Sequence, residues 1–312
     1  MIYNPTAGPR DVQRGLKRVS SSLKRRGWSV ELRLTEKPGD AISLARAAAQ
    51  SGYDVVVAAG GDGTVNETVN GLVGTRTALG VLPVGTGNLL AKQLGISTHT
   101  LTNPRRLHEA ATGLAEGTIR LVDVGQVNDQ YFLCWAGIGL DAQVTTEMEP
   151  RQRRTKRLGV LPYAIAAVLV ARDFQGVRTR VSLDGNIVRS NTLLILVSNI
   201  QQYAGILNVA REARMDDGLL DVFIFKGLGF SYAVRHLLKI ISQRYLQDPH
   251  VVHRQARRIE VWTEEAVPVQ ADGDPIGATP ITLQVVPHAL RILVPPSAPP
   301  GLFTPTTQEE GM

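Results

Sequence analysis

A glycine-rich turn between a buried strand and a helix is the feature that most constrains how this chain can fold. Residues 55–59 form a continuous apolar run, which is typical of a parallel strand buried on both faces. The turn Gly60-Gly61-Asp62-Gly63 follows directly, and a helix is predicted over residues 65–72. A strand over residues 79–83 is followed by a second turn of this kind, with Gly85 and Gly87, and by another helix. Two such units in succession indicate a parallel sheet covered by helices.

The same alternation extends through the first 118 residues. Strands are predicted over residues 1–4 and 28–34, and helices over residues 12–26 and 40–50. We therefore predict an N-terminal doubly wound α/β domain over residues 1–118. In such sheets ligands bind beyond the carboxyl ends of the strands, so both glycine turns are expected at the binding edge.

The pattern changes to short alternating strands after residue 118. They predict a C-terminal antiparallel β-sandwich domain over residues 119–294, whose last segment can pack back on the first domain. Helices are expected to interrupt this domain only at residues 158–174 and 231–245. Residues 295–312 are rich in proline and are expected to form a loose tail.

Composition limits the class of protein. The chain has 312 residues and a formal net charge of +6, which favours an anionic partner. Its single cysteine, Cys134, excludes an internal disulfide and a cysteine-based zinc site. No apolar run reaches the ~20 residues that cross a bilayer, and the N-terminus has no signal-peptide pattern, so a cytoplasmic protein is expected. The short first strand leaves open a true start upstream of Met1.

The first glycine turn has the chemistry of a phosphate-binding loop. Glycine lets the backbone approach a ligand, and the N–H groups at a helix N-terminus favour negative charge. Asn66 and Leu90 stand where a dinucleotide-binding loop needs a small residue, and the chain lacks the Gly-Lys pair of a Walker loop. The alternative is that these glycines serve the geometry of the turn alone.

Five blocks of sequence together resemble one protein family. Gly60-Gly61-Asp62-Gly63-Thr64 is similar to a signature shared by diacylglycerol, sphingosine and NAD kinases and by phosphofructokinases. The other blocks narrow the resemblance, over about residues 1–294, to the diacylglycerol kinase catalytic family in its bacterial soluble lipid kinase branch. The first block continues as Val65-Asn66-Glu67-Thr68-Val69-Asn70-Gly71. The other four blocks are Asn4-Pro5-Thr6-Ala7-Gly8, Leu82-Pro83-Val84-Gly85-Thr86-Gly87-Asn88, Asp216-Asp217-Gly218-Leu219-Leu220-Asp221-Val222 and Ala271-Asp272-Gly273-Asp274-Pro275.

The resemblance implies an ATP site in the first domain. Its residues would come from the ends of the first two strands and from the two glycine turns. They are Asn4, Thr35, Gly60, Gly61, Asp62, Gly63, Thr64, Val65, Asn66, Glu67, Gly85 and Thr86.

The resemblance also implies a carboxylate that accepts the proton of the acceptor hydroxyl. Asp274 is at that position, where the family more often has a glutamate that is one methylene longer. Asp272 in the same turn is a competing candidate. Without the resemblance, Asp-Gly between two strands is simply a hairpin turn.

Mg²⁺ is implied at two places. Asp62 would repel phosphate unless a cation lies between them, which gives it a metal-linked catalytic role; the alternative is that it stabilises its own turn. Asp217 matches a structural Mg²⁺ position of the bacterial lipid kinases, with the carbonyl groups of Arg214 and Leu219 completing the oxygen ligands. The alternative for Asp217 is another acidic turn. The second glycine turn departs from the family at Leu89, where an aspartate is more usual.

A lipid substrate implies contact with a membrane surface. Residues 151–157 carry five positive charges and precede an apolar stretch over residues 158–170, a combination that suits anionic headgroups. A solvated loop before a core helix is the alternative. Residues 254–258 form a second basic stretch. The sequence defines neither the lipid nor the oligomeric state, and a homodimer stays open.

The expected function is that of an ATP- and Mg²⁺-dependent kinase acting on a hydroxyl of a diacylglycerol-like lipid, at the periphery of an anionic membrane. One alternative is an NAD kinase-type enzyme with a small-molecule substrate. The other is a non-catalytic protein that binds nucleotide or anionic lipid and has lost activity through changes such as Asp274. Nucleic acid is not expected as a partner, because the basic residues lack interleaved aromatic side chains.

Overall fold

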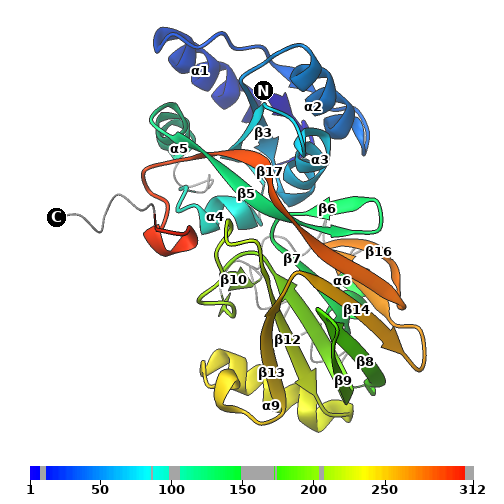
Figure 1. Cartoon of the computed structure of the whole chain (residues 1–312). Coiled ribbons are helices and arrows are strands. Elements are labelled where there is room, and N and C mark those ends of the chain that lie inside the picture. The colour runs from blue at the N-terminus through cyan, green and yellow to red at the C-terminus, as the bar shows by residue number, and fades with distance from the viewer. Residues whose placement is uncertain are drawn as a thin grey trace, which may run out of the picture. The chain divides into compact units, whose positions relative to one another are not determined.

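The computed structural model describes residues 1–7, 12–85, 87–97, 106–148, 172, 174–203 and 207–305 (Figure 1). The chain forms two compact units. Unit 1 contains residues 1–124, residues 214–217 and the chain from Pro287 onward, and unit 2 contains residues 125–213 and 218–286. The first boundary lies inside a strand rather than at residue 118, because the strand β5 (Thr118–Val127) continues into unit 2, where Gly125–Val127 pair with β6 (Gln130–Phe132).

Unit 1 is built on a sheet in the order β17-β4-β3-β1-β2, in which all pairings are parallel. The apolar run predicted as a buried strand is the central strand β3, in which Val56, Val57, Ala58 and Ala59 are at most 4% exposed. Of the strand expected over residues 28–34, only two residues are paired. The strands are β1 (Ile2–Tyr3), β2 (Arg33–Leu34), β3 (Val55–Gly60), β4 (Ala78–Pro83) and β17 (Ile281–Val294).

The helices of unit 1 form two packed pairs. Helix α2 packs against α3, and α1 packs against α5. Figure 1 shows these pairs on either side of β3, as right-handed crossovers between parallel strands require. This arrangement confirms the predicted doubly wound α/β fold. The helices are α1 (Val12–Arg25), α2 (Asp40–Gln50), α3 (Asp62–Leu72), α4 (Leu89–Gln93) and α5 (Arg106–Ala115).

Unit 2 contains two rows of strands that share the long strand β9. The second half of β9 pairs with β7 and β12, and its first half pairs with β8, all in antiparallel fashion. One row is β16-β15-β7-β9-β12-β13 and the other is β9-β8-β14-β17-β5-β6. The strands not yet given are β7 (Trp135–Gly139), β8 (Val177–Leu183), β9 (Asn186–Ser198), β12 (Leu220–Lys226), β13 (Val251–Ala256), β14 (Arg258–Thr263), β15 (Pro268–Ala271) and β16 (Asp274–Ala278).

The core of unit 2 draws apolar side chains from both rows. Ile138 of β7 and Val222 of β12 belong to the same buried cluster as Val181 of β8 and Leu283 of β17. This shared core confirms the predicted β-sandwich. The sandwich also carries the helices α6 (Leu140–Met148) and α9 (Gly229–Ile241) and a separate hairpin of β10 (Gln202–Tyr203) and β11 (Leu207–Asn208). Most of the helix expected over residues 158–174 lies outside the described residues.

The chain beyond β17 was expected to form a loose tail, but in the structure it is anchored at residues 302–304. Leu302 and Phe303 are buried, and the carbonyl oxygen of Leu302 accepts a hydrogen bond from the Met215 N–H at 3.0 Å. The proline content hid these two apolar anchors. Among the residues that the structure describes, no helix combines the length and the apolar character needed to cross a membrane.

Candidate active site

The carboxyl ends of four neighbouring parallel strands of unit 1 carry candidate residues. Asn4 follows β1, Thr35 follows β2, Gly60 ends β3, and Gly85 lies just beyond β4. The backbone ties these positions to the sheet: the Thr35 N–H donates to Tyr3 O at 3.0 Å, and the Gly85 N–H donates to Gly60 O at 3.1 Å. Because the strands are parallel, both glycine turns lie at one edge of the sheet, as predicted.

The first glycine turn opens helix α3 without a side-chain cap. Gly61 is the N-cap residue and has extended backbone angles, so no N-cap side chain binds the N–H groups of the first turn. Gly63 is exposed, and a Cβ added there would find no atom within 4 Å. Neither packing nor a left-handed backbone requires this glycine, and a residue without a side chain would let a ligand approach the N-terminus of α3 closely.

The two glycine turns are in direct backbone contact. A Cβ at Gly85 would lie 2.5 Å from the Cα of Gly61, and a Cβ at Gly87 would overlap the carboxylate of Asp62. These two glycines are therefore required by packing. The contact holds the N-terminus of α3 beside the turn that leads into α4.

Asp62 ties the two turns together through its carboxylate. Its Oδ1 accepts a hydrogen bond from the Leu89 N–H at 2.6 Å, at the start of α4. Burial raises the pKa of Asp62, while hydrogen bonds from the N–H groups of Leu89 and Asn88 and the charge of Lys92 lower it. The departure at Leu89 does not disturb this contact, because only the backbone of that residue takes part.

The remaining side chains of the first motif point into unit 1. Thr64 and Val65 are buried, and the amide oxygen of Asn66 accepts a hydrogen bond from Asn70 at 3.1 Å. Glu67 accepts a hydrogen bond from the Ala41 N–H at 3.1 Å, which fixes α3 against the start of α2. This part of the motif holds the helix in place. The Val65 N–H already donates to Gly61 O at 3.1 Å, so a phosphate would meet the backbone N–H groups that precede Val65.

At the start of unit 1, the carboxamide oxygen of Asn4 accepts hydrogen bonds from the N–H and the hydroxyl of Thr6, at 2.9 and 2.8 Å. Thr35 is buried. Thr86 lies outside the described residues.

Asp272 is a structural residue of the hairpin between β15 and β16. Asp272 and Gly273 both have positive φ, which is the geometry of a tight two-residue turn. The Asp272 carboxylate is buried and accepts hydrogen bonds from the N–H groups of Leu133, Cys134 and Trp135, at 2.7 to 2.9 Å. With both oxygens engaged in this way, Asp272 is the weaker of the two candidates for a proton acceptor.

Asp274 differs from Asp272 in its surroundings. It is the first residue of β16 and is exposed, and it pairs across the hairpin with Ala271. The turn before it is fixed by the Gly273 N–H, which donates to the side-chain oxygen of Gln270 at 2.8 Å. The hairpin therefore presents Asp274 on a rigid turn.

The structure adds a buried carboxyl group that the sequence reasoning missed. Asp141, at the start of α6, is 3% exposed and accepts hydrogen bonds from Tyr203 and, at 2.6 Å, from Gln270 Nε2. Burial raises the pKa of Asp141 to about 6, although both hydrogen bonds act in the opposite direction. Through Gln270 this group is connected to the turn that precedes Asp274. A lone aspartate in the apolar stretch over residues 132–142 was the available signal.

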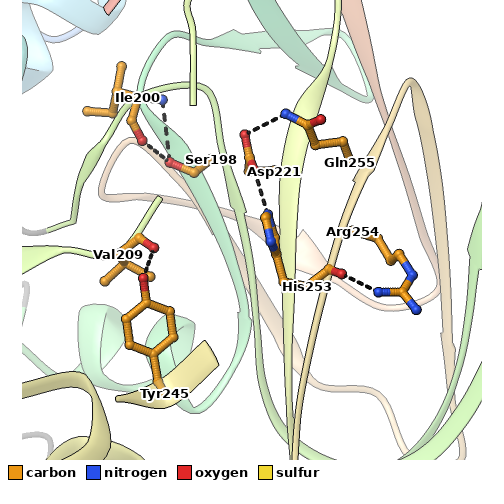
Figure 2. A network of polar contacts seen from close by, with 8 residues as sticks. All are labelled: Ser198, Ile200, Val209, Asp221, Tyr245, His253, Arg254 and Gln255. Atoms are coloured by element: carbon orange, nitrogen blue, oxygen red, sulfur yellow. Dashed lines mark hydrogen bonds and ion pairs between the residues drawn. The ribbon is translucent and has the colours of Figure 1, made fainter. Parts of the chain in front are cut away.

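The acidic block over residues 216–222 contains both structural residues and a candidate metal ligand. Asp216 accepts a hydrogen bond from the Thr304 N–H at 2.7 Å. Figure 2 shows Asp221 held by two side chains of β13, with His253 Nε2 at 2.6 Å and Gln255 at 3.4 Å. Asp217 and Arg214 belong to unit 1, and Leu219 belongs to unit 2. The described residues contain no group of three or more His, Cys, Asp or Glu side chains that could hold a metal.

Apart from the metal candidates Asp217, Arg214 and Leu219, the predicted site residues fall into two groups. The glycine turns, Asn4 and Thr35 are brought together in unit 1, and Asp272 and Asp274 share one turn of unit 2. The basic run over residues 151–157 and the apolar stretch over residues 158–170 lie outside the described residues.

Two protein families match the chain in succession. The diacylglycerol kinase catalytic domain matches residues 1–127, and the YegS C-terminal NAD kinase beta sandwich-like domain matches residues 135–294. The matches follow the order of the α/β unit and the β-sandwich.

Individual proteins agree with this assignment. Diacylglycerol kinase of Bacillus subtilis (strain 168) is 31% identical over 90% of this chain and 90% of its own length, and that of Staphylococcus carnosus (strain TM300) is 28% identical over 95% and 94%. A crystal structure described as that of a putative diacylglycerol kinase from Bacillus anthracis str. Sterne aligns with this chain with a TM-score of 0.79. The two chains are 26% identical, and the alignment covers 96% of this chain and 97% of that chain. The fold, the glycine turns and these matches define a lipid kinase. The chain belongs to the diacylglycerol kinase family.

Proposed function

We propose that this protein transfers the γ-phosphoryl group of ATP to a hydroxyl group of a diacylglycerol, in a reaction that requires Mg²⁺. The observation that carries the proposal is Gly63, an exposed glycine at the open N-terminus of α3 that nothing else in the described structure requires. The names of the relatives that match about nine-tenths of this chain support the lipid as acceptor.

The phosphate groups of ATP would bind at the first turn of α3. Its N–H groups lie at the positive end of the helix dipole, where an anion is stabilised. The glycine at position 63 lets phosphate oxygens approach these groups closely. Thr35 and Asn4, at the ends of the neighbouring strands, would border the same pocket.

Asp274 would accept the proton of the acceptor hydroxyl. As the hydroxyl oxygen forms its bond to the γ-phosphorus, the bond from that phosphorus to the bridging oxygen breaks and ADP leaves. The released proton passes to the carboxylate of Asp274 and then to water. A positioned base of this kind contributes roughly 10²- to 10⁴-fold to a rate.

Mg²⁺ would be held by oxygen ligands of two candidate sets. The Asp217 carboxylate and the carbonyl groups of Arg214 and Leu219 are oxygen donors of the type that Mg²⁺ prefers. Asp62 is a second carboxylate close to the phosphate loop. When bound, the ion neutralises the charge that develops on the phosphoryl oxygens.

The lipid acceptor would be met at the surface of an anionic membrane, with the protein bound peripherally. The basic run over residues 151–157 and the net charge of +6 support this part of the proposal.

The test is transfer of labelled phosphate from γ-labelled ATP with Mg²⁺, measured separately with diacylglycerol in detergent micelles and with NAD. We expect labelled phosphatidic acid in the first reaction and no labelled product in the second. Labelled NADP alone would replace the proposal with a small-molecule kinase. Binding of ATP without any transfer would indicate the non-catalytic alternative.

A further inference from the structure

Asp141 is a buried carboxyl group that the reaction proposed above does not use. It lies at the start of α6 and is 3% exposed. A Cβ at Gly137 of β7 would overlap Asp141 Oδ2, so the strand passes this carboxylate only because the residue there is a glycine. Glycine inside a strand weakens the strand, and it often marks the close approach of another group. The sheet is therefore built to accommodate this carboxylate.

Gln270 connects Asp141 to the hairpin turn between β15 and β16. It is fully buried and lies opposite Gly137 in the ladder of β15 and β7. Gln270 Nε2 donates to Asp141 Oδ2 at 2.6 Å, and Gln270 Oε1 accepts from the Gly273 N–H at 2.8 Å. An ionised carboxylate only accepts hydrogen bonds and a backbone N–H only donates, so one orientation of the carboxamide satisfies both partners. The ionised Asp141 therefore fixes the side-chain oxygen of Gln270 on the turn.

The two residues of the turn that precede Asp274 are both tied down. The Asp272 N–H donates to Trp135 O at 2.9 Å, which fixes the first residue of the turn on β7. The Gly273 N–H donates to Gln270, which fixes the second residue, directly before Asp274. Helix α6 also packs against β16, the strand that begins with Asp274. The contacts of the α6 carboxylate thus reach the peptide group beside the proposed proton acceptor.

Tyr203 supplies the second hydrogen bond to Asp141. Its hydroxyl donates to Asp141 Oδ1, and its ring packs on Trp135 with 4.5 Å between the ring centroids. Because Trp135 is itself buried, this packing holds the hydroxyl in place. The hydrogen bonds lower the pKa of Asp141 and burial raises it further than they lower it, to about 6. The group therefore changes charge between about pH 5 and pH 7.

Few ionisable groups lie on the elements around Asp141. Helix α6 packs against β7, β9, β15 and β16. Strands β7 and β15 contain no ionisable side chain, and Arg189 lies in the first half of β9, which pairs with β8. The remaining groups in the described structure are Tyr203, which donates to Asp141, and Asp272 and Asp274 of the turn itself. The carboxylate of Asp272 faces the backbone of residues 133–135.

We propose that Asp141 is a positioning residue of the kinase reaction, which in its ionised form holds the turn before Asp274 through Gln270 and so places the proton acceptor. The inference rests on the proposed function, because Asp141 acts only through Asp274. It also deepens that function, since the rate of transfer then depends on the charge of a buried group that acts through another residue.

Protonation of Asp141 would loosen the turn by a defined route. A proton on Oδ2 faces the donor group of Gln270, so the carboxamide has to rotate and the Gly273 N–H loses its acceptor. A proton on Oδ1 obliges Tyr203 to accept instead of donate, and Oδ2 then keeps a neutral hydrogen bond, roughly half as strong as the charge-assisted one. In both cases the contact that fixes Gly273 is weakened.

The first test is the pH dependence of kcat for transfer to diacylglycerol in detergent micelles. We expect kcat of wild type to fall roughly tenfold from pH 7 to pH 5, as when one group with a pKa of about 6 must be ionised. Asp141→Asn and Gln270→Met should lack this decrease. Both should lower kcat at pH 8 by roughly tenfold or more, with the KM for ATP unchanged, because a displaced base slows the reaction without affecting the nucleotide.

Each variant has a matched control in unit 2. Asp129→Asn changes an exposed aspartate, and Gln284→Met removes an amide contact to Gln126 at 2.9 Å. Both controls should keep the wild-type kcat and pH profile. Tyr203→Phe leaves Asp141 and Gln270 in place, so it serves where the other variants do not fold. Since the Tyr203 hydroxyl lowers the pKa of Asp141, its loss should move the decrease in kcat to higher pH.

The second test does not depend on activity. In spectra of protein labelled with ¹⁵N-glycine, the amide resonance of Gly273 should titrate with a midpoint near pH 6 in wild type and should not titrate in Asp141→Asn or Gln270→Met. A Gly273 resonance that does not titrate in wild type would overturn the proposal, as would wild-type kcat in Gln270→Met or an unmoved pH profile in Tyr203→Phe. Absence of micellar transfer in wild type would contradict the proposed function, whereas the Gly273 resonance would still decide whether Asp141 sets the turn.

Discussion

The glycines of the two loops have different physical reasons. Gly85 and Gly87 are required because a side chain there would strike Gly61 or Asp62. Gly63 lies in the first turn of a helix, has open space beside it and is exposed. A glycine in a helix costs about 0.5–1 kcal/mol relative to alanine, and the proposed phosphate site would account for this cost at Gly63.

The variant Gly63→Ala separates these reasons. We expect it to raise the free energy of unfolding by about 0.5–1 kcal/mol and to weaken ATP binding at least tenfold, about 1.4 kcal/mol. Thermal unfolding and equilibrium titration with a fluorescent ATP analogue measure the two effects. The matched control is Gly113→Ala in helix α5, where a Cβ would make an ordinary 3.4 Å contact and ATP binding should not change. Unchanged ATP affinity in Gly63→Ala would argue against a phosphate site at this turn.

The two aspartates of the β15–β16 turn are predicted to act differently. Asp272→Asn removes a buried carboxylate that accepts three backbone hydrogen bonds, so it should lower the free energy of unfolding by about 2–4 kcal/mol. Asp274→Asn changes an exposed side chain and should alter stability by less than about 1 kcal/mol. Urea unfolding of both variants measures this difference. A stability loss in Asp274→Asn as large as in Asp272→Asn would show that the exposed aspartate is structural.

At the level of elements, α6 and the β15–β16 hairpin are connected by a buried polar group. Asp141 of α6 binds Gln270 of β15, and Gln270 binds the N–H of Gly273 in the turn. The raised pKa of Asp141, about 6, has a consequence for stability. The folded protein holds a proton that the unfolded chain, with a pKa of about 3.9, has already released. The free energy of unfolding therefore falls as the pH rises between about 4 and 6. Above that range Asp141 lowers it by the full amount.

We expect this cost to be about 3 kcal/mol, since the shift is about two units. The measurement is the difference in free energy of unfolding between wild type and Asp141→Asn from pH 4 to pH 8. As the pH rises, the wild type should lose stability relative to the variant, and the difference in free energy of unfolding should be constant above about pH 7. Tyr203→Phe removes a hydrogen bond to the carboxylate and should move the midpoint to higher pH. A difference that does not depend on pH would show that Asp141 stays ionised.

At the scale of the whole molecule, much of the architecture could be predicted from the sequence. The α/β unit could be predicted because its signals are local. They are the apolar run before Gly60 and the composition of the two glycine turns. The alternating runs after residue 118 defined the sandwich in the same way. The glycine turns at one sheet edge followed from parallel topology.

Other features depend on contacts between distant segments and were not predictable. The capture of Asp272 by the loop before β7 joins residues about 140 positions apart, so no local pattern indicates it. The same holds for Asp141 with Tyr203 and Gln270. Pro-rich composition suggested a loose tail, but Leu302 and Phe303 bury themselves in unit 1. The exposure of Leu238 and Ile241 on α9 is likewise visible only in the folded protein.

The initial rate of phosphate transfer from ATP to micellar diacylglycerol, for wild type and for Asp274→Asn, is the measurement that tests the central claim most directly. ATP binding is measured on the same samples. We predict labelled phosphatidic acid with wild type, and a rate at least roughly 100-fold lower with Asp274→Asn while its ATP affinity is unchanged. A wild-type enzyme that labels no lipid, or a variant with the wild-type rate, would contradict the account.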